Sequence, residues 1–202
     1  SKIVKVNKII DPKILKKIDN SYFMTDGNKE NLTFIFEVAK VLKLKKENLF
    51  RVLNKFRGLK YRQQIVFKSK NLTIINDSKA TSFSSSASIL KSLSNVYWIV
   101  GGLAKKGDKL LLPRSHCKNS KAYIFGKNKI FFINKIKKIM KYESFTSLKF
   151  LIEKIFIDIK NNRNHNHQTI LFSPAAASFD VFDNFEERGK YFNNLIRKFF
   201  NV

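Results

Sequence analysis

The sequence predicts an α/β fold in which helices flank a mostly parallel sheet. From residue 63 onward, short apolar runs typical of strands alternate with segments whose apolar residues have helical spacing. Glycine or other small residues follow several of these runs directly, as at Gly101, Gly126 and Ser173. Apolar residues make up 44% of the 202 residues, which is enough for a packed core. Such alternation favours parallel strands joined by helices.

The N-terminal part of the chain predicts helices alone. Between residues 32 and 55, apolar side chains recur at intervals of three and four, as at Ile35, Val38 and Leu42. Glu47 and Asn48 are typical of a helix start, so this segment divides into two helices. We expect Gly58 to end the helical region.

The sheet and its helices follow in order. Residues 63–76 predict two short strands around the polar turn 68–71. Beyond them, apolar runs predict buried strands, and apolar residues at helical spacing predict helices. The expected order is a helix at 84–93, strands at 96–102 and 121–126, helices at 127–140 and 144–160, a strand at 169–178 and a final helix at 186–200.

Three polar loops each follow a predicted strand directly, at residues 76–81, 101–106 and 173–178. Parallel strands end at the same edge of a sheet, and ligands of α/β proteins bind at that edge. The topology therefore predicts one site to which all three loops contribute.

The first two of these loops carry lysines. Residues 77–81, Asp-Ser-Lys-Ala-Thr, precede a predicted helix and fit either an N-cap cluster or an anion site. Capping does not explain Lys79. Residues 101–108 form a glycine turn with lysines, but their spacing matches neither a Walker A loop nor a dinucleotide-binding fingerprint. Two lysine-bearing loops at one edge predict a ligand that carries carboxylate or phosphate.

Other chemistries find less support. The serines of the third loop lack a Gly-x-Ser-x-Gly elbow, which argues against a serine nucleophile. His165 with His167, and His116 with Cys117, lack the paired spacing of zinc ligands, so we predict no metal site. The longest uncharged stretch, 92–104, is too short to span a bilayer, and the N-terminus has no secretory pattern. We expect a cytoplasmic protein without membrane insertion.

The formal net charge of +25 raises the possibility of a nucleic-acid partner. However, only seven of the 40 basic residues are arginine, the residue favoured for contacts to phosphates and bases. The lysines are also spread along the whole chain. A codon bias towards A and T is our preferred interpretation, and a basic nucleic-acid-binding domain without catalysis is the alternative.

The three loops resemble motifs of the Mur ligase family, in the wording of its D-glutamate-adding members. These motifs are "INDSKATS" at 75–82, "GGLAKKGD" at 101–108 and "SPAAASFDVFDNFEERG" at 173–189. Upstream, "NKEN" at 28–31 and "GLKYR" at 58–62 are similar to two further family motifs, so the resemblance covers nearly the whole chain.

The resemblance implies two domains. Residues 1–58 would be the helical C-terminal remnant of the family's central ATP-binding domain. Residues 59–202 would be its Rossmann-like C-terminal domain, which binds glutamate. The family's P-loop, magnesium carboxylates and UDP site have no counterpart here, so we expect a fragment that is inactive alone.

The resemblance also implies an activity. Family members use ATP and Mg²⁺ to activate the carboxylate of UDP-N-acetylmuramoyl-L-alanine as an acyl phosphate, which the amine of D-glutamate then attacks. Such an enzyme would be monomeric when full length, and closure about a hinge at 58–62 would bring its domains together. The residues implied for D-glutamate are Lys79, Thr81, Lys105, Ser178 and Phe185, and those implied for ATP are Asn31, Arg62 and Asp77.

Several positions depart from the family wording, namely Gly27, Lys60, Tyr61 and Ser82. These departures leave a catalytically dead Mur-like binding module as a further alternative. Within the third motif, we expect the charged residues Asp180, Glu186, Glu187 and Arg188 to fix loop and helix geometry, and we expect Phe179 and Phe182 to lie in the core.

Overall fold

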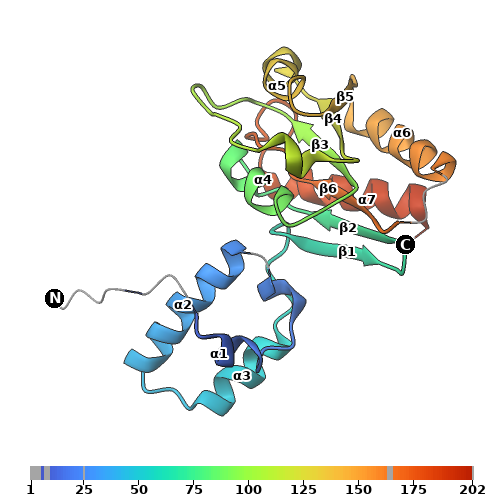
Figure 1. The fold of residues 1–202 in the computed structure, drawn as a ribbon. Helices are drawn as coiled ribbons and strands as arrows, with labels where there is room; N and C mark the ends of the chain where they lie inside the picture. The colour runs from blue at the N-terminus through green and yellow to red at the C-terminus, as the bar shows by residue number, and fades with distance from the viewer. Residues whose placement is uncertain (1–5, 7–9, 25, 163–165, 202) are drawn as a thin grey trace. The chain divides into compact units, whose positions relative to one another are not determined.

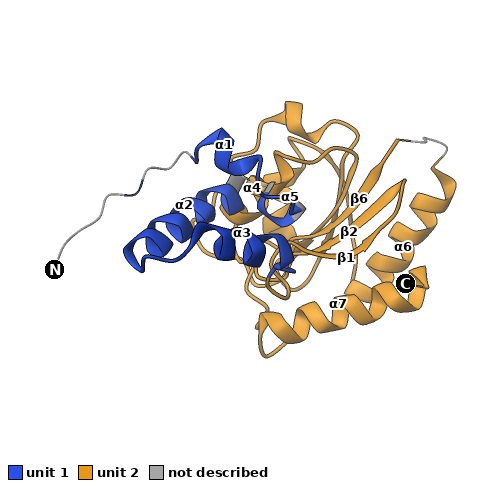
Figure 2. Cartoon of the chain, turned by 90° about the horizontal axis from the view of Figure 1, so that it is seen from below, with its two compact units in different colours: residues 1–58 blue, residues 59–202 orange. Residues whose placement is uncertain are grey.

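The computed structural model describes residue 6 and residues 10–24, 26–162 and 166–201. The chain divides into two compact units, residues 1–58 and residues 59–202, which Figure 2 colours separately. The division falls directly after Gly58, whose φ of 78° is in the left-handed region that favours glycine.

The first unit is helical. Its elements are α1 (Pro12–Leu15), the 3₁₀ turn η1 (Ser21–Met24), α2 (Asp26–Val41) and α3 (Lys46–Lys55). The prediction of two helices within residues 32–55 is therefore confirmed. A small apolar core holds them together and includes Ile10, Ile18, Phe23, Leu32 and Leu53.

The second unit contains one six-stranded sheet (Figure 1), with the strand order β1-β2-β6-β3-β4-β5. Among the strands that the structure describes, β1 and β2 pair antiparallel, as a hairpin, and the other neighbouring strands pair parallel. The predicted fold class is confirmed. The strands are β1 (Gln64–Lys68), β2 (Leu72–Asn76), β3 (Val96–Gly101), β4 (Lys121–Phe125), β5 (Lys141–Ser144) and β6 (Gln168–Phe172).

Helices cover both faces of this sheet, and alternate residues of each central strand face opposite layers. Trp98 of β3 packs in the cluster that contains residues of α4 (Phe83–Leu90) and α5 (Lys129–Ile136). The next residue, Ile99, packs in the cluster of α6 (Leu148–Asn161) and α7 (Phe185–Phe200). Within the run Val96–Val100, every residue except the half-buried Tyr97 is buried, because a layer of helices covers each face.

Polar side chains define where three of these helices begin. Ser82, Ser147 and Asn184 each accept a hydrogen bond from a backbone N–H in the first turn of α4, α6 and α7, respectively. The predicted helix from 144 is wrong at its start, because Lys141–Ser144 forms β5 instead. The connection between β3 and β4 contains the 3₁₀ turn η2 (Arg114–Cys117).

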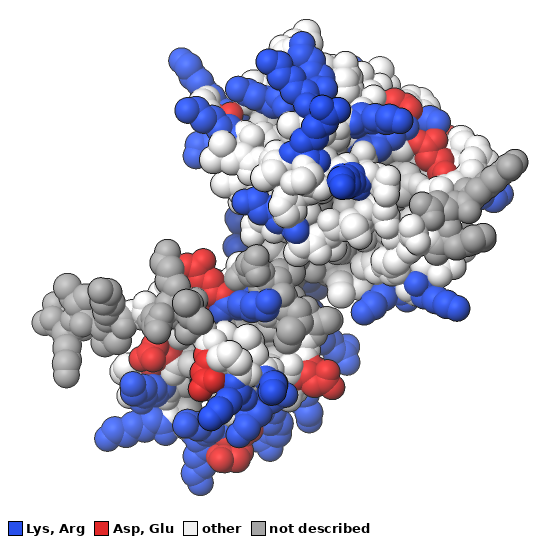
Figure 3. All heavy atoms as spheres, in the orientation of Figure 1, with Lys and Arg blue, Asp and Glu red and all other residues white. Residues whose placement is uncertain are grey.

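Lys and Arg side chains are scattered over both units on the face that Figure 3 shows. Across the part of the chain that the structure describes, no helix is both long and apolar enough to cross a membrane. Of the histidines considered as zinc ligands, His165 lies outside the described residues. The ring of His167 contacts the Thr73 hydroxyl and the Lys70 carbonyl, at 2.9 and 3.0 Å.

Candidate functional site

The three motif loops meet at one edge of the sheet. β2, β6 and β3 are parallel neighbours, so their carboxyl ends lie together. The Asp77 amide donates to the Phe172 carbonyl at 2.7 Å, and the Gly101 amide donates to the Pro174 carbonyl at 2.9 Å. Leu103 and Ala177 form an antiparallel bridge, with both N···O distances at 3.1 Å. The loops are thus joined by main-chain hydrogen bonds.

Arg188, the second-last residue of the third motif, lies buried beneath these loops. Its Nε donates to the Ser78 hydroxyl at 3.1 Å, and its Nη2 donates to the carbonyls of Ser78 and Ala176 at 2.7 and 2.9 Å. One guanidinium therefore fixes the first motif against the third. Burial lowers the pKa of Arg188 to about 10, an effect that the charge of Asp180 opposes, so the side chain stays charged at neutral pH.

The second motif fits closely around this guanidinium. A Cβ atom at Gly102 would come 2.8 Å from the Ala177 carbonyl oxygen and 3.3 Å from Arg188 Nη1. The φ of Gly102 is 131°, a backbone conformation that L side chains rarely adopt. Two separate constraints therefore require glycine at this position.

Carboxylates of the second and third motifs anchor loops rather than face solvent freely. Asp108 accepts a hydrogen bond from the Phe83 amide at 2.7 Å, at the start of α4. Asp180 accepts from the Lys127 amide at 3.1 Å, and Glu187 accepts from the Asp183 amide at 2.9 Å. The expectation that Asp180, Glu187 and Arg188 fix geometry agrees with these contacts.

Asp77 is also buried, and only 6% of its surface is exposed. Oδ1 accepts from the Gln63 amide and Oδ2 accepts from the Ser173 hydroxyl, both at 3.1 Å. Burial raises the pKa of the Asp77 carboxyl from 3.8 to about 7, against the opposing effects of those two hydrogen bonds and of the Arg62 charge. Asp77 therefore links the segment before β1 to the end of β6.

The residues expected to bind D-glutamate lie on the joined loops. The ammonium of Lys79 lies 4.0 Å from the centre of the Phe185 ring, a cation–π distance that brings two of them into direct contact. Thr81 is exposed, and Lys105 is exposed two residues beyond the bridged Leu103. Ser178 directly follows the bridged Ala177, and 3% of its surface is exposed. No direct contact joins Lys105 to Ser178 within the described residues.

The residues expected to bind ATP are divided between the units. Asn31 is an exposed residue of α2 in the first unit, where its amide lies 3.5 Å from the Asn28 side chain. Arg62 and Asp77 belong to the second unit, where Arg62 is exposed and its charge reaches Asp77. Asn31 and Asp77 are therefore not brought together within one unit.

A small apolar cavity of about 310 Å³ lies beside the third motif. Its lining includes Phe125, Gly126, Val181, Phe182 and Tyr191. Phe182 packs against the Tyr191 ring, but 71% of the surface of Phe179 is exposed. The expectation that Phe179 lies in the core is therefore wrong, since its loop leaves the sheet edge before α7 begins.

Sequence reasoning did not identify several residues that hold the site. The Asn76 amide bridges the Gly189 carbonyl and the Asn193 side chain, at 2.9 and 2.7 Å. Ser86 contacts Ser173 at 2.8 Å between the hydroxyl oxygens. Asn76 and Ser173 belong to the first and third motifs, but nothing in the sequence indicates which distant groups they bind. Among the described residues, no three His, Cys, Asp or Glu side chains gather as metal ligands.

Comparison with known proteins gives consistent relatives. No family model matches the chain. It is 32% identical over 180 residues to the UDP-N-acetylmuramoylalanine–D-glutamate ligase of Rickettsia bellii, covering 89% of this chain and 40% of that protein. The proteins of the same name from the Wolbachia of Brugia malayi and from Francisella tularensis SCHU S4 are 34% and 32% identical. These matches cover 85% and 91% of this chain but 34% and 44% of the relatives, so the chain spans less than half of their length.

One solved structure supports the fold. The UDP-N-acetylmuramate–alanine ligase of Thermotoga maritima superposes with a TM-score of 0.57 at 13% identity. The superposition covers 86% of this chain and 38% of that one. At this identity the likeness shows the fold alone.

Proposed function

Because the chain belongs to the Mur ligase family, we propose that it is the C-terminal part of an ATP-dependent ligase that joins D-glutamate to UDP-N-acetylmuramoyl-L-alanine in peptidoglycan synthesis. The observation that carries the proposal is the joining of three motif loops at one sheet edge, through the Leu103–Ala177 bridge and Arg188. The relatives of the same printed name support this assignment over other Mur ligase reactions.

The charges at this edge suit D-glutamate, which has two carboxylates and one amine. Lys79 and Lys105 would each bind a carboxylate through charge-assisted hydrogen bonds, and the hydroxyls of Thr81 and Ser178 would add neutral donors. The Phe185 ring, 4.0 Å from the Lys79 ammonium, would hold that lysine in place. Neither lysine has an acidic partner within the described residues, so both are available to a ligand.

ATP would lie between this edge and the rest of the ligase. Arg62 would bind its phosphates, Asn31 would lie near the adenine, and Asp77 would accept from the ribose hydroxyls. Both carboxylate oxygens of Asp77 already accept one hydrogen bond, so the ribose would use the remaining lone pairs. Mg²⁺ would be held mainly by carboxylates of the part of the ligase that lies outside this chain.

The proposed reaction transfers the γ-phosphoryl group of ATP to the carboxylate of the muramoyl-alanine substrate. The amine nitrogen of D-glutamate then attacks that carbonyl carbon. A C–N bond forms, phosphate leaves, and the nitrogen loses a proton. Lys79 and Lys105 would hold the carboxylates of D-glutamate so that the amine stays directed at the carbon, and Arg62 would offset charge on the transferred group.

The first unit supports a larger parent protein. Phe34, Val38 and Val41 of α2 are 49%, 56% and 64% exposed, although they recur at helical spacing as the residues of a buried face do. An exposed apolar stripe of this kind is typical of a surface that packs against further protein. We infer that residues 1–58 complete the ATP-binding domain of the ligase.

A chimera tests the proposed function. This chain replaces the matching segment of the Rickettsia bellii ligase, and ATP-dependent formation of the D-glutamyl product is measured. We expect turnover from the chimera and none from the chain alone. Lys105→Ala should lower kcat/KM for D-glutamate by about 100-fold, since a charge-assisted contact to a substrate carboxylate is lost.

Lys106→Ala is the matched control, because Lys106 is the exposed neighbour of Lys105 and should leave kcat/KM unchanged. Equal effects of both variants would count against the site. D-glutamate binding without turnover would favour a catalytically dead module, for which the altered residues Gly27, Lys60 and Tyr61 are the reason. Binding of RNA alone, weakening steeply with salt, would favour the nucleic-acid alternative.

A further inference from the structure

A second concave site lies at the edge of the sheet opposite the motif loops. A hollow of about 860 Å³ is lined by Val96, Lys121 and Lys141, the first residues of β3, β4 and β5. An adjoining hollow of about 710 Å³ shares Lys121 and Lys141 with it. Since these strands are parallel, their first residues mark the end of the sheet farthest from the three motif loops.

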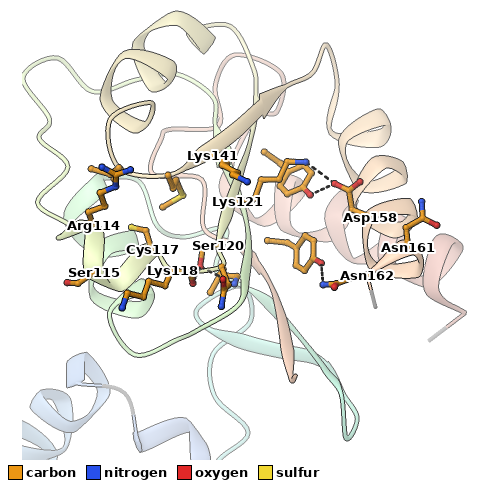
Figure 4. Close-up of a pocket in the computed structure, with 16 residues that line it drawn as sticks. Arg114, Ser115, Cys117, Lys118, Ser120, Lys121, Lys141, Asp158, Asn161 and Asn162 are labelled. Atoms are coloured by element: carbon orange, nitrogen blue, oxygen red, sulfur yellow. Dashed lines mark hydrogen bonds and ion pairs between the residues drawn. The ribbon is translucent and has the colours of Figure 1, made fainter. Parts of the chain in front are cut away.

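The charged side chains that line this region are mostly basic, as Figure 4 shows for part of it. Arg114 and Lys118 come from the β3–β4 connection on one side, and Asp158 lies on the opposite side with Lys121 and Lys141 between. We call this region the basic hollow, and its six basic residues are Arg114, Lys118, Lys121, Lys137, Lys138 and Lys141.

The two acidic side chains of the basic hollow are already neutralised within it. Lys121 Nζ lies 2.6 Å from a Glu143 oxygen and 3.0 Å from an Asp158 oxygen. Asp158 also pairs with Lys154 and accepts from the Tyr123 hydroxyl. Lys121 and Lys154 thus compensate both carboxylates, and they leave the other basic side chains without an acid.

Five cations of the basic hollow therefore have no acidic partner among the described residues. Across the described residues, Arg114, Lys118, Lys137, Lys138 and Lys141 form no salt bridge. Like charges gathered around a cleft repel one another and focus a positive potential, and a bound anion relieves that repulsion. Arg114 and Lys118 lie between β3 and β4, whereas Lys137, Lys138 and Lys141 lie between the end of α5 and the start of β5, so the fold brings the two groups together.

We propose that the basic hollow binds a small molecule that carries two or more phosphate groups. The volume of each of its two hollows, about 860 and 710 Å³, falls within the range of about 300–1,000 Å³ that is typical of small-molecule sites. Arg114 can bind phosphate oxygens in a bidentate manner, and the lysines act as compact point charges. Ser115 and Asn119 line the same wall and add neutral donors. This site is separate from the proposed D-glutamate site and does not depend on it.

Titration of the full chain with inorganic pyrophosphate at low salt tests this site, with binding followed by calorimetry. We expect saturable binding of one pyrophosphate per chain. Changing Arg114→Gln together with Lys141→Gln should raise the dissociation constant for pyrophosphate at least tenfold. Arg51→Gln with Lys55→Gln removes the same two charges from exposed positions of α3 and should change it less than twofold.

Two further variants locate the bound pyrophosphate. Lys105→Ala should leave its affinity unchanged, and loss of binding in that variant would place the anion at the motif loops and overturn the proposal. The exchanged pair Arg114→Lys with Lys141→Arg keeps the charge and should retain binding, even if the glutamine pair fails to fold. If pyrophosphate does not bind saturably, or if both glutamine pairs weaken its binding equally, the basic hollow is not a specific site and the proposal is wrong. A single-stranded RNA that binds more tightly than pyrophosphate, and equally to both pairs, would have the same consequence.

Discussion

Buried charged side chains hold loops together at one edge of the central sheet, whereas the charges described at the other edge are exposed or partly exposed. At the carboxyl edge, Asp77 and Arg188 are 6% and 0% exposed, and backbone or hydroxyl groups of neighbouring loops bind both. At the amino edge, the side chains of Lys118 and Lys141 are exposed and form no salt bridge within the described residues. Asp77 and Arg188 fix the backbone of three loops, and among the described residues no buried charge has that role at the amino edge. Lysines without an acidic partner in the described part of the chain are available to ligands at both edges.

This difference explains why only one edge carries recognisable motifs. A buried guanidinium bound to two carbonyls tolerates few substitutions, because any replacement leaves those acceptors unsatisfied. An exposed lysine placed one or two positions earlier or later in the sequence would still contribute to the same positive potential. A site that depends on long-range electrostatic potential therefore need not show a recognisable sequence motif.

Removing Arg188 should have the largest effect. We expect Arg188→Ala to lower the free energy of unfolding by about 3–5 kcal/mol, since two carbonyls and one hydroxyl lose buried donors. Urea denaturation followed by circular dichroism measures the change. Arg197→Ala on the same helix is the control. Arg197 is exposed, and among the described residues its guanidinium donates to the Asn194 side chain alone, so a loss of less than about 0.5 kcal/mol is expected. Similar losses for both arginines would break the comparison.

Asp77 should make stability depend on pH. Its carboxyl has a folded pKa of about 7 and an ordinary value of 3.8, so the folded chain binds more protons than the unfolded chain between these values. Stability from this group is complete below about pH 4 and is lost as the pH rises through 7. The loss should be on the order of 2–4 kcal/mol, and Asp77→Asn should abolish it.

Thermal and urea unfolding of both proteins at pH 4 and pH 8 would measure the Asp77 contribution. The difference between wild type and Asp77→Asn isolates this group from other carboxyls that titrate in the same window. Parallel pH profiles would show that the buried carboxyl keeps an ordinary pKa.

Gly102 should be less tolerant of a methyl group than Gly107. Gly102→Ala combines strain at φ 131° with a contact of 2.8 Å to a carbonyl oxygen, and should cost about 2–3 kcal/mol. Gly107 has a φ of 78°, and a Cβ added there would have no neighbour within 4 Å. Gly107→Ala should therefore lower the free energy of unfolding by about 1 kcal/mol. Urea midpoints of the two variants give the comparison, and equal values would mean that the loops relax around the added methyl.

The ion pairs of Lys121 should contribute least. Its side chain is 27% exposed, and Lys121→Gln should lower the free energy of unfolding by about 0.5–1 kcal/mol at low salt. The effect should shrink in 0.5 M NaCl, because salt screens partly exposed pairs. A salt-independent loss as large as that of Arg188→Ala would mean that the amino edge is also fixed by buried charge.

Sequence reasoning located the central strands and their loops because these signals are local. Val96–Val100 is a continuous apolar run, and Gly101 and Gly102 end it, so both the strand and its edge can be read directly. β5 gave no such signal: Lys141, Tyr142 and Ser144 are exposed on an edge strand and carry no apolar pattern. The prediction that Phe179 is buried was wrong for a related reason. It rested on the apolar residue type alone, without the path of the loop that carries it.

The candidate site was predictable in its residue types but not in its internal bonding. Lys79, Lys105 and Ser178 were identified by resemblance to motifs, whereas the backbone amide of Gln63 as a partner of Asp77 has no sequence signal at all. Backbone donors are present at every position apart from proline, so only the fold decides which of them meet a buried carboxylate.

Residues 61–63 are anchored to the second unit, and this limits where the hinge expected between the two units can lie. The Tyr61 carbonyl accepts from the Lys79 amide at 3.0 Å, and the Gln63 amide donates to Asp77. The Tyr61 ring also packs so closely on Gly189 that a Cβ there would come within 2.4 Å of it. The Tyr61 side chain therefore packs residues 61–63 against the start of α7. The hinge expected at residues 58–62 is therefore confined to Gly58 and the exposed Leu59 and Lys60.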